Sequence, residues 1–264
     1  MPTIEDIVTS LENFAPPELA EDWDNVGLLV GSPEWPATRI LTCLTITPTT
    51  VAEAIEHRVE LIVAHHPLPF HSLKTITTAT TAGRMLLQLI GARIGVYSSH
   101  TAFDSAQTGI NQHLAIGLDL QQIEPLIPAV DAAEAEIGSG RMGSSGGQIS
   151  LMEMVERVKS FLGIDTVRVV GGDNQPVNMV AIACGSGGTL LSTAIDRGCD
   201  CLVTGEITFH DCLEADARGV GLVLPGHFAS EQFALLSLAE YLGEQHSGVE
   251  VWASRDERDP LRSV

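Results

Sequence analysis

The sequence predicts an α/β protein with two similar lobes, in which mixed, largely parallel sheets are flanked by helices. Along most of the 264 residues, apolar runs of strand length alternate with amphipathic helical segments. This alternation is typical of parallel sheets covered by helices. In addition, two stretches in the N- and C-terminal halves share a similar pattern, and 44% of the residues are hydrophobic. The chain can therefore bury a large core in one or two domains.

The N-terminal lobe, expected over residues 1–124, begins with a helix. Thr3 is a suitable N-cap, acidic residues follow it, and apolar residues then recur at helical spacing. Pro16 and Pro17 end the segment. The patterns that follow predict, in order, a strand near 40–46, a helix near 49–57, a strand near 61–64, a helix near 82–90 and a strand near 94–97.

The regular pattern is interrupted after about Glu124. A run of small residues from Gly138 to Gly147 is typical of a loop, so residues 125–150 are expected to link the first lobe to a C-terminal lobe at 151–264. Both lobes are expected to contribute residues to one metal site. For this reason the two lobes can also form a single structural unit. The second lobe is predicted to contain helices near 151–162, 190–197, 209–217 and 229–242, and strands near 167–170, 179–183, 201–203, 222–224 and 249–253.

The two halves contain similar phrases. Residues 52–66 align with residues 191–206, and each stretch carries an Ala-Ile pair before an apolar strand. Further on, His100-Thr-Ala-Phe-Asp104 corresponds to His227-Phe-Ala-Ser-Glu231, and both phrases read His-x-x-x-carboxylate. We interpret this as a duplicated βαβ unit whose strand ends face one crevice.

Imidazoles and carboxylates gather where the predicted strands end, which is where parallel α/β sheets bind ligands. Such groups suit divalent transition metals. The side chains of neighbouring residues diverge, so a pair of cations about 3.5–4 Å apart explains an adjacent histidine pair better than one cation does. The residues concerned are His65, His66, His100, Asp104, Glu206, His227 and Glu231.

Each of these motifs also has an interpretation without function. An isolated His-His-Pro sequence is typical of a surface turn, and His-x-x-x-Asp or His-x-x-x-Glu is a common pairing at a helix start. The metal interpretation depends on their coincidence, because all of them fall at predicted strand ends and in corresponding places of the two halves. On pattern alone, both interpretations stay open.

The motifs together resemble a known family. Trp23-Asp-Asn-Val-Gly-Leu28, then the His65-His66-Pro, His100–Asp104, Thr204-Gly-Glu206 and Gly226–Glu231 phrases, occur in the order seen in the YbgI-type family. Its members are also called Nif-three-like proteins and GTP cyclohydrolase 1 type 2 homologues. The resemblance extends from about Ile4 to Pro260. Longer members carry an inserted domain between the halves, so this chain is similar to the short form.

The resemblance implies a dinuclear centre in a Nif-three-like fold. The implied metal ligands are His65, His66, Asp104, His227 and Glu231, which would hold two divalent cations per subunit from among Zn, Mn, Fe, Ni and Co. It also implies a toroidal homohexamer with the metals facing an interior cavity. The implied function is a metal-dependent hydrolase that acts on a nucleotide or another phosphorylated small molecule. For GTP, the reaction would be hydrolytic opening of the imidazole ring at C8. The alternative is a non-catalytic, oligomeric metal-binding adaptor or regulatory protein.

The chain departs from the family pattern in two places. After its first strand the family has Leu-Asp, whereas this chain has Leu44-Thr45, and Pro225 replaces an acidic or small residue. Neither position belongs to the implied ligand set. Thr45, however, removes a carboxylate from the neighbourhood of the implied site.

His100, His210 and Glu206 are the candidate catalytic residues. The two histidines are placed to transfer protons, but His100 can equally orient a ligand, and His210 can equally be a helix-surface residue. Glu206 can orient water or a metal ligand. The Trp23-Asp24-Asn25 motif can shape the edge of the site, although an aromatic anchor with turn residues is the commoner explanation.

The glycine-rich segment from Cys184 to Thr189 lies between a predicted strand and helix. It can cradle a phosphate with its backbone amides, but it lacks the lysine of a P-loop and the full dinucleotide pattern. A tight turn is the favoured interpretation.

The amino-acid composition limits where the protein can be located and which partners it can bind. The net charge of −20 disfavours broad nucleic-acid binding. The five cysteines lack CxxC spacing, which indicates reduced thiols rather than a disulfide framework. No apolar stretch has the length of a membrane span, and the acidic N-terminus does not resemble a signal peptide. We therefore expect a cytoplasmic protein that does not enter membranes.

Overall fold

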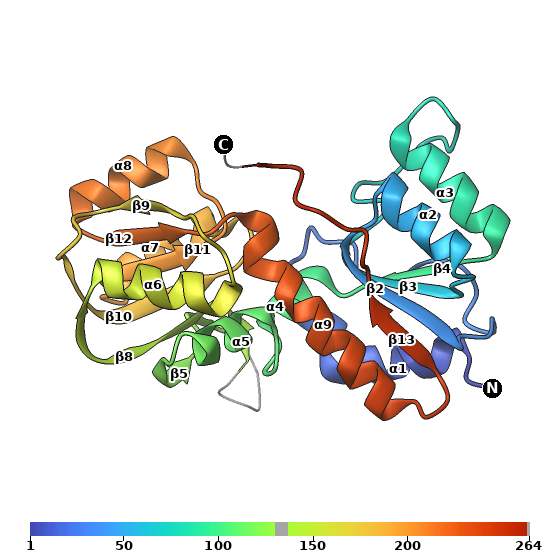
Figure 1. Ribbon diagram of the computed structural model, residues 1–264, viewed down its shortest axis with the longest axis horizontal. Helices are drawn as coiled ribbons and strands as arrows, with labels where there is room; N and C mark the ends of the chain where they lie inside the picture. The colour runs from blue at the N-terminus through green and yellow to red at the C-terminus, as the bar shows by residue number, and fades with distance from the viewer. Residues whose placement is uncertain (130–136, 263–264) are drawn as a thin grey trace. The chain divides into compact units, whose positions relative to one another are not determined.

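The computed structural model describes residues 1–129 and 137–262, and it confirms a mixed α/β fold with two main sheets flanked by helices (Figure 1). The chain divides into two compact units. Unit 1 consists of Met1–Phe103 and Ala234–Pro260, and unit 2 consists mainly of Asp104–Phe233. The chain passes from one unit to the other within two helices, α4 (His100–Ser105) and α9 (His227–Gln245).

Unit 1 is built on a five-stranded sheet with the order β1-β4-β3-β2-β13. Its strands are β1 (Gly27–Val30), β2 (Arg39–Thr45), β3 (Leu61–His66), β4 (Gly95–Ser98) and β13 (Glu250–Ala253). The four strands from β13 to β4 are parallel, and β1 is antiparallel to β4. The carboxyl ends of β2, β3 and β4 therefore lie at one edge of the sheet, which is the edge where parallel sheets bind ligands.

Helices cover both faces of this sheet (Figure 1). They are α1 (Ile4–Phe14), the 3₁₀ turn η1 (Pro17–Leu19), α2 (Pro48–Glu56), α3 (Thr81–Ala92) and the part of α9 that follows Phe233. The apolar sides of α2 and α3 pack with the sheet in a buried cluster that includes Leu41, Val51 and Leu86. On α9, the Leu235 carbonyl accepts a hydrogen bond from the Thr42 hydroxyl of β2 at 2.8 Å.

Unit 2 contains a six-stranded sheet with the order β5-β8-β10-β11-β12-β9. Only β10, β11 and β12 are parallel to one another. The strands are β5 (Gln121–Glu124), β8 (Arg141–Ser150), β9 (Arg168–Val170), β10 (Pro176–Ala183), β11 (Cys201–Thr204) and β12 (Gly221–Leu224). A small separate ladder pairs β6 (Ile127–Pro128) with β7 (Gly138–Ser139).

The helices of unit 2 follow the predicted βα alternation in its second part. They are α5 (Ile110–Gly117), α6 (Leu151–Leu162), the 3₁₀ turn η2 (Gly187–Leu190), α7 (Leu191–Asp196) and α8 (Phe209–Arg218). Helix α6 has a capping box, because the Ser150 side chain accepts from the Glu153 amide and Glu153 accepts from the Ser150 amide. Within the described residues, no helix has the length and apolar character to cross a bilayer.

The prediction of a loop at Gly138–Gly147 is wrong, because β8 begins at Arg141 and pairs with β5 and β10. Small side chains permit this pairing, since a Cβ atom on Gly143 would lie 2.9 Å from the Gln121 carbonyl oxygen. Residues 130–136 of the expected 125–150 linker, and residues 263–264 of the expected C-terminal lobe, lie outside the described residues.

The two units also differ from the expected lobes in their bounds. The last part of the chain returns to unit 1, because β13 pairs in parallel with β2. Residue spacing along the chain does not reveal this return, since the paired residues are more than 200 positions apart.

Among the described residues, Arg141 is the largest fully buried side chain, and it links β7 and β8 to the α4–α5 region of unit 2. The residue is 1% exposed, and its guanidinium donates hydrogen bonds of 2.7–3.3 Å to five acceptors among the described residues. The acceptors are the Gln112 side chain and the carbonyls of Gly138, Gly140, Ser105 and Ala106. The fork geometry of arginine satisfies several buried carbonyls at once.

Replacing Arg141 with Met is expected to lower the free energy of unfolding by about 3–5 kcal/mol, because it leaves several buried carbonyls without their donor. Urea denaturation followed by circular dichroism measures the change. Arg218→Met is the matched control, since Arg218 is an exposed residue of α8. It is expected to change stability by less than about 0.5 kcal/mol. Equal effects of the two substitutions would contradict the structural role of Arg141.

Candidate metal site

Unit 1 brings three imidazoles together. His65 and His66 end β3, and His100 begins α4 directly after β4. The ring centroids lie 5.0 Å apart for His65 and His66, 5.1 Å for His65 and His100, and 5.4 Å for His66 and His100. One nitrogen of each ring lies within 4.8 Å of the others, so this imidazole cluster can hold a metal ion.

Neighbouring side chains hold each histidine of the imidazole cluster. Nδ1 of His66 lies 2.7 Å from the Thr45 hydroxyl oxygen, and Nδ1 of His100 donates to Asp24 at 2.7 Å. The carbonyl of His65 accepts a 2.6 Å hydrogen bond from the Ser98 hydroxyl. In His66 and His100, Nε2 is therefore the ring nitrogen suited to a cation or a proton, as in many metal sites where a partner engages the other nitrogen.

Asp24 is a residue of the site whose contacts the sequence did not predict. Besides His100, it accepts hydrogen bonds from the amide and the hydroxyl of Thr101, at 3.1 and 2.5 Å. Burial of the Asp24 carboxyl raises its pKa, but the hydrogen bonds from His100 and Thr101 outweigh this and lower the pKa to about 2. Asp24 is thus a carboxylate at neutral pH and fixes the orientation of His100.

The backbone at His100 is unusual, with a φ of 26°. A non-glycine residue with positive φ is strained unless its surroundings hold it there, and such residues occur often at functional sites. The contact with Asp24 supplies part of that restraint.

A second carboxylate, Glu257, lies at the end of β2, where the chain carries Thr45. It accepts hydrogen bonds from the amides of Leu44 and Thr45 at 2.9 and 2.6 Å. Burial raises the pKa of Glu257, and the two amide hydrogen bonds oppose this effect. The strand end that lacks an aspartate therefore still has a carboxylate beside it, contributed from near the end of the chain.

In unit 2, His227 and Glu231 lie one helical turn apart at the start of α9. His227 donates from Nδ1 to Glu206 at 3.0 Å and from Nε2 to Glu231 at 3.1 Å. The hydrogen bond with Glu231 is the main cause that raises the pKa of His227 to about 9, against the effect of burial. The hydrogen bond from His227 in turn lowers the pKa of Glu206. Glu206 thus orients an imidazole.

Asp104 is fixed by contacts that involve Cys184. The thiol of Cys184 donates to Asp104 Oδ1 at 3.1 Å, and Asn111 donates to the Asp104 carbonyl at 3.1 Å. The side-chain oxygen of Asn111 also accepts from the Cys184 amide at 2.7 Å. Burial raises the pKa of the Cys184 thiol well above its usual value, so the thiol remains a donor.

The glycine-rich segment after β10 packs tightly against the start of α9. At Gly185, which has a φ of +58°, a Cβ atom would lie 2.1 Å from Glu231 Oε1. The amide of Gly185 donates to the Ser230 hydroxyl and the amide of Gly187 donates to the Thr204 hydroxyl, both at 3.0 Å. These amides are used within unit 2, which favours the tight-turn interpretation over a phosphate cradle.

The third candidate catalytic residue, His210, lies on α8 and is exposed beside Phe209, with the ring centroids 5.9 Å apart. Within residues 1–129 and 137–262, no metal-binding group includes His210. These surroundings correspond to the helix-surface interpretation.

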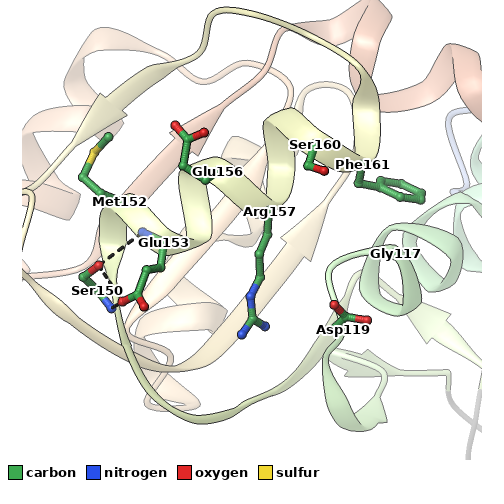
Figure 2. A pocket seen from close by; sticks show the side chains of 9 residues that line it. All are labelled: Gly117, Asp119, Ser150, Met152, Glu153, Glu156, Arg157, Ser160 and Phe161. Carbon is green, nitrogen blue, oxygen red and sulfur yellow. Dashed lines mark hydrogen bonds between the residues drawn. The ribbon is translucent and has the colours of Figure 1, made fainter.

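Unit 2 contains a groove of about 760 Å³. Figure 2 shows the residues that line it, most of which lie on α6. Arg157 on its wall donates to the carbonyls of Leu118 and Ser145, at 3.1 and 3.3 Å. The described residues that line it include neither histidine nor cysteine: Gly117, Asp119, Ser150, Met152, Glu153, Glu156, Arg157, Ser160 and Phe161. The groove therefore lacks the nitrogen and sulfur donors that a transition metal prefers.

Comparison with known proteins covers almost the whole chain. The sequence profile of the family described as Duf34/NIF3 (NGG1p interacting factor 3) matches residues 2–260. A "GTP cyclohydrolase 1 type 2 homolog" of Clostridium perfringens is 35% identical over 262 residues, which cover 99% of each chain. A "GTP cyclohydrolase 1 type 2" of Helicobacter pylori is 32% identical over 92% of each chain.

Among solved structures, a hypothetical protein of Staphylococcus aureus is similar over the full length of both chains. Its TM-score is 0.90 and its sequence identity is 30%. The fold of the present chain is thus one that an experimentally determined structure also has.

Thr45→Val is expected to weaken binding of a divalent cation about 10- to 100-fold, because it removes the hydroxyl beside Nδ1 of His66. Competition between the protein and a chelator for Co²⁺ measures the change. Thr9→Val is the matched control, since the Thr9 hydroxyl donates to Glu5 on an exposed helix face. A Thr45→Val protein with the affinity of the control would show that this contact does not orient His66.

Asp24→Asn tests the low pKa of Asp24. A carboxylate whose pKa is lowered by folding stabilises the protein above its ordinary pKa of 3.8, and this contribution is lost as the pH falls towards about 2. The variant is expected to be less stable than the native chain at pH 7, and the difference should shrink between pH 4 and pH 2. Urea midpoints across this range measure it, with the exposed Asp22→Asn as control. A difference that stays constant with pH would refute the assignment.

Proposed function

Because the chain belongs to the Duf34/NIF3 family, we propose that it is a metal-dependent hydrolase whose histidine and carboxylate groups hold two divalent cations. The observation that carries the proposal is the imidazole cluster of unit 1, with one nitrogen of each ring within 4.8 Å of the others. The names of the curated relatives, which include GTP cyclohydrolase 1 type 2 homologues, support hydrolysis of a nucleotide.

The donor chemistry fits such cations. Imidazole nitrogens with carboxylate oxygens suit Zn, Mn, Fe, Ni or Co. In the proposal, the residues that hold the two cations are His65, His66, Asp104, His227 and Glu231. His100 of unit 1 and Asp104 of unit 2 are four residues apart in α4, and His227 and Glu231, both of unit 2, are four residues apart in α9. When bound, divalent cations of this type polarise the substrate and lower the pKa of water to about 7.

His100 is the proposed proton carrier. Its Nδ1 donates to Asp24, so Nε2 can accept a proton from water and return it to the leaving nitrogen or oxygen. Glu206 has a different role in the proposal, because its hydrogen bond to Nδ1 of His227 orients that ring towards Glu231. Protein contacts thus set the orientation of both imidazoles before any substrate arrives.

For a purine nucleotide, the proposed reaction is balanced with water alone. One water adds at C8 and the C8–N9 bond breaks, which opens the imidazole ring and leaves a formamide. A second water cleaves the formamide and releases C8 as formate, with no oxidant or reductant.

Homohexameric assembly and a cytoplasmic location stay predictions.

The metal test uses protein purified without a chelator, with metal quantified by elemental analysis. His66→Ala and Glu231→Ala are each expected to reduce bound metal severalfold or more, while circular dichroism stays unchanged. The controls are His57→Ala and Glu240→Ala, because both residues are exposed and Glu240 lies on α9 itself. If the site variants retain as much metal as the controls, the proposed ligand set is refuted.

The turnover test incubates the metal-loaded protein with GTP and measures formate. Release of formate that His227→Ala abolishes would support the hydrolase. Full metal loading without turnover of GTP or other phosphorylated substrates would refute the hydrolase and favour a non-catalytic metal-binding adaptor.

A further inference from the structure

Two large aromatic side chains, Trp23 and Phe70, are exposed next to each other in unit 1. Trp23 is 61% exposed and Phe70 is 44% exposed, and their ring centroids lie 6.1 Å apart at an interplanar angle of 39°. Leaving large aromatic surface in water forgoes the stabilisation that its burial would give. The stability of the fold therefore does not explain why this aromatic pair is exposed.

Both rings adjoin the imidazole cluster. The centroid of His100 lies 5.8 Å from that of Trp23 and 5.8 Å from that of Phe70, in edge-on arrangements. His100 is itself one of the three imidazoles that can share a metal ion. A ligand ring that lies against Trp23 or Phe70 would therefore be next to the groups that can hold a cation and transfer a proton.

The backbone that carries the two rings is held in place. Asn25, two residues after Trp23, donates from its side chain to the carbonyl of Pro69, just before Phe70, at 2.8 Å. Asp24 is fixed by His100 and Thr101. The protein thus fixes the two loops while their aromatic faces remain in solvent, as in preorganised ligand sites.

We propose that Trp23 and Phe70 form a stacking surface for the purine ring of the substrate. This inference rests on the proposed function, because it places the ring beside the proposed catalytic groups. Aromatic side chains bind nucleobases through their π-faces, and a heteroaromatic ring is the ligand that two exposed, tilted rings suit best. The net charge of −20 adds to the argument, because a strongly acidic chain favours recognition through the ring over recognition through phosphate.

Equilibrium binding of three probes to the protein as purified tests this. Guanosine and guanosine monophosphate are expected to bind with similar affinities, whereas ribose 5-phosphate, which lacks the ring, should bind at least tenfold more weakly. Isothermal titration calorimetry measures the three affinities. Equal binding of ribose 5-phosphate and guanosine monophosphate, or no binding of guanosine, would overturn the proposal.

Substitutions then identify the surface. Trp23→Ala and Phe70→Ala are each expected to weaken guanosine binding about 5- to 100-fold, the range for loss of one stacking partner. Trp23→Phe should retain most of the affinity, while Trp23→Leu, which keeps apolar bulk without a π-face, should not. Phe209→Ala removes a ring that is 72% exposed in unit 2 and serves as the control. An affinity that is the same in Trp23→Leu and Trp23→Phe would refute stacking.

The metal content of each variant separates this inference from the proposed function. Because both rings are exposed, the variants are expected to fold and to bind as much metal as the native chain. Loss of guanosine binding at full metal content supports the stacking surface. Unchanged guanosine binding at full metal content overturns the stacking surface but leaves the proposed function intact. The proposed metal site is tested separately, by the metal content of the His66→Ala variant.

Discussion

The chemistry of the candidate site depends on one repeated contact, in which a side-chain oxygen engages Nδ1 of a histidine. Thr45 does this for His66, Asp24 does it for His100, and Glu206 does it for His227. The contact determines the orientation of each ring and leaves Nε2 as the nitrogen that can bind a cation or carry a proton. Histidine side chains that rotated freely would lose conformational entropy when they bound a cation, so these contacts reduce that loss before binding.

Backbone geometry supports the same arrangement in unit 2. At the ends of β10 and β11, Gly185 and Gly205 leave no room for a Cβ atom, because Glu231 and Ser230 of α9 approach to within 2.1 and 2.6 Å of where it would stand. These glycines are thus a packing requirement: they allow the helix that carries His227 and Glu231 to begin directly against the sheet. The sequence of this region favours a tight turn over a phosphate cradle, and the hydrogen bonds of its amides within unit 2 agree with the tight turn.

Most of the regular elements could be predicted from the sequence, because apolar periodicity and end signals are local. Helix α6 has the predicted bounds, 151–162, and its capping box is visible in the sequence from Ser150 to Glu153. Strand β8 was missed because its glycines and serines carry no apolar alternation. Its pairing is fixed instead by close backbone approach to Gln121 and by the buried Arg141. The family resemblance, which rested on motif order, is confirmed over residues 2–260.

The candidate site was predictable only in part. The adjacent histidines at the end of β3 and the His-x-x-x-carboxylate phrases stand out, because metal donors there form short motifs. The sequence does not show which residues contact Asp24, Cys184 and Glu257. Each of the three contacts a residue that is 76 or more positions away. Single acidic or thiol residues of this kind have no local signature, so only the fold reveals what they touch.

Unit 1 is discontinuous in the chain, and this determines when it can be completed during synthesis. Strand β13 pairs with β2, and Glu257 accepts hydrogen bonds from the last amides of β2. Both emerge from the ribosome after the Asp104–Phe233 segment of unit 2. Unit 2 is formed mainly by one uninterrupted segment, so it can fold while translation continues. Until β13 is added, the nascent chain therefore leaves the β2 edge of the first sheet unpaired, and such an edge favours aggregation.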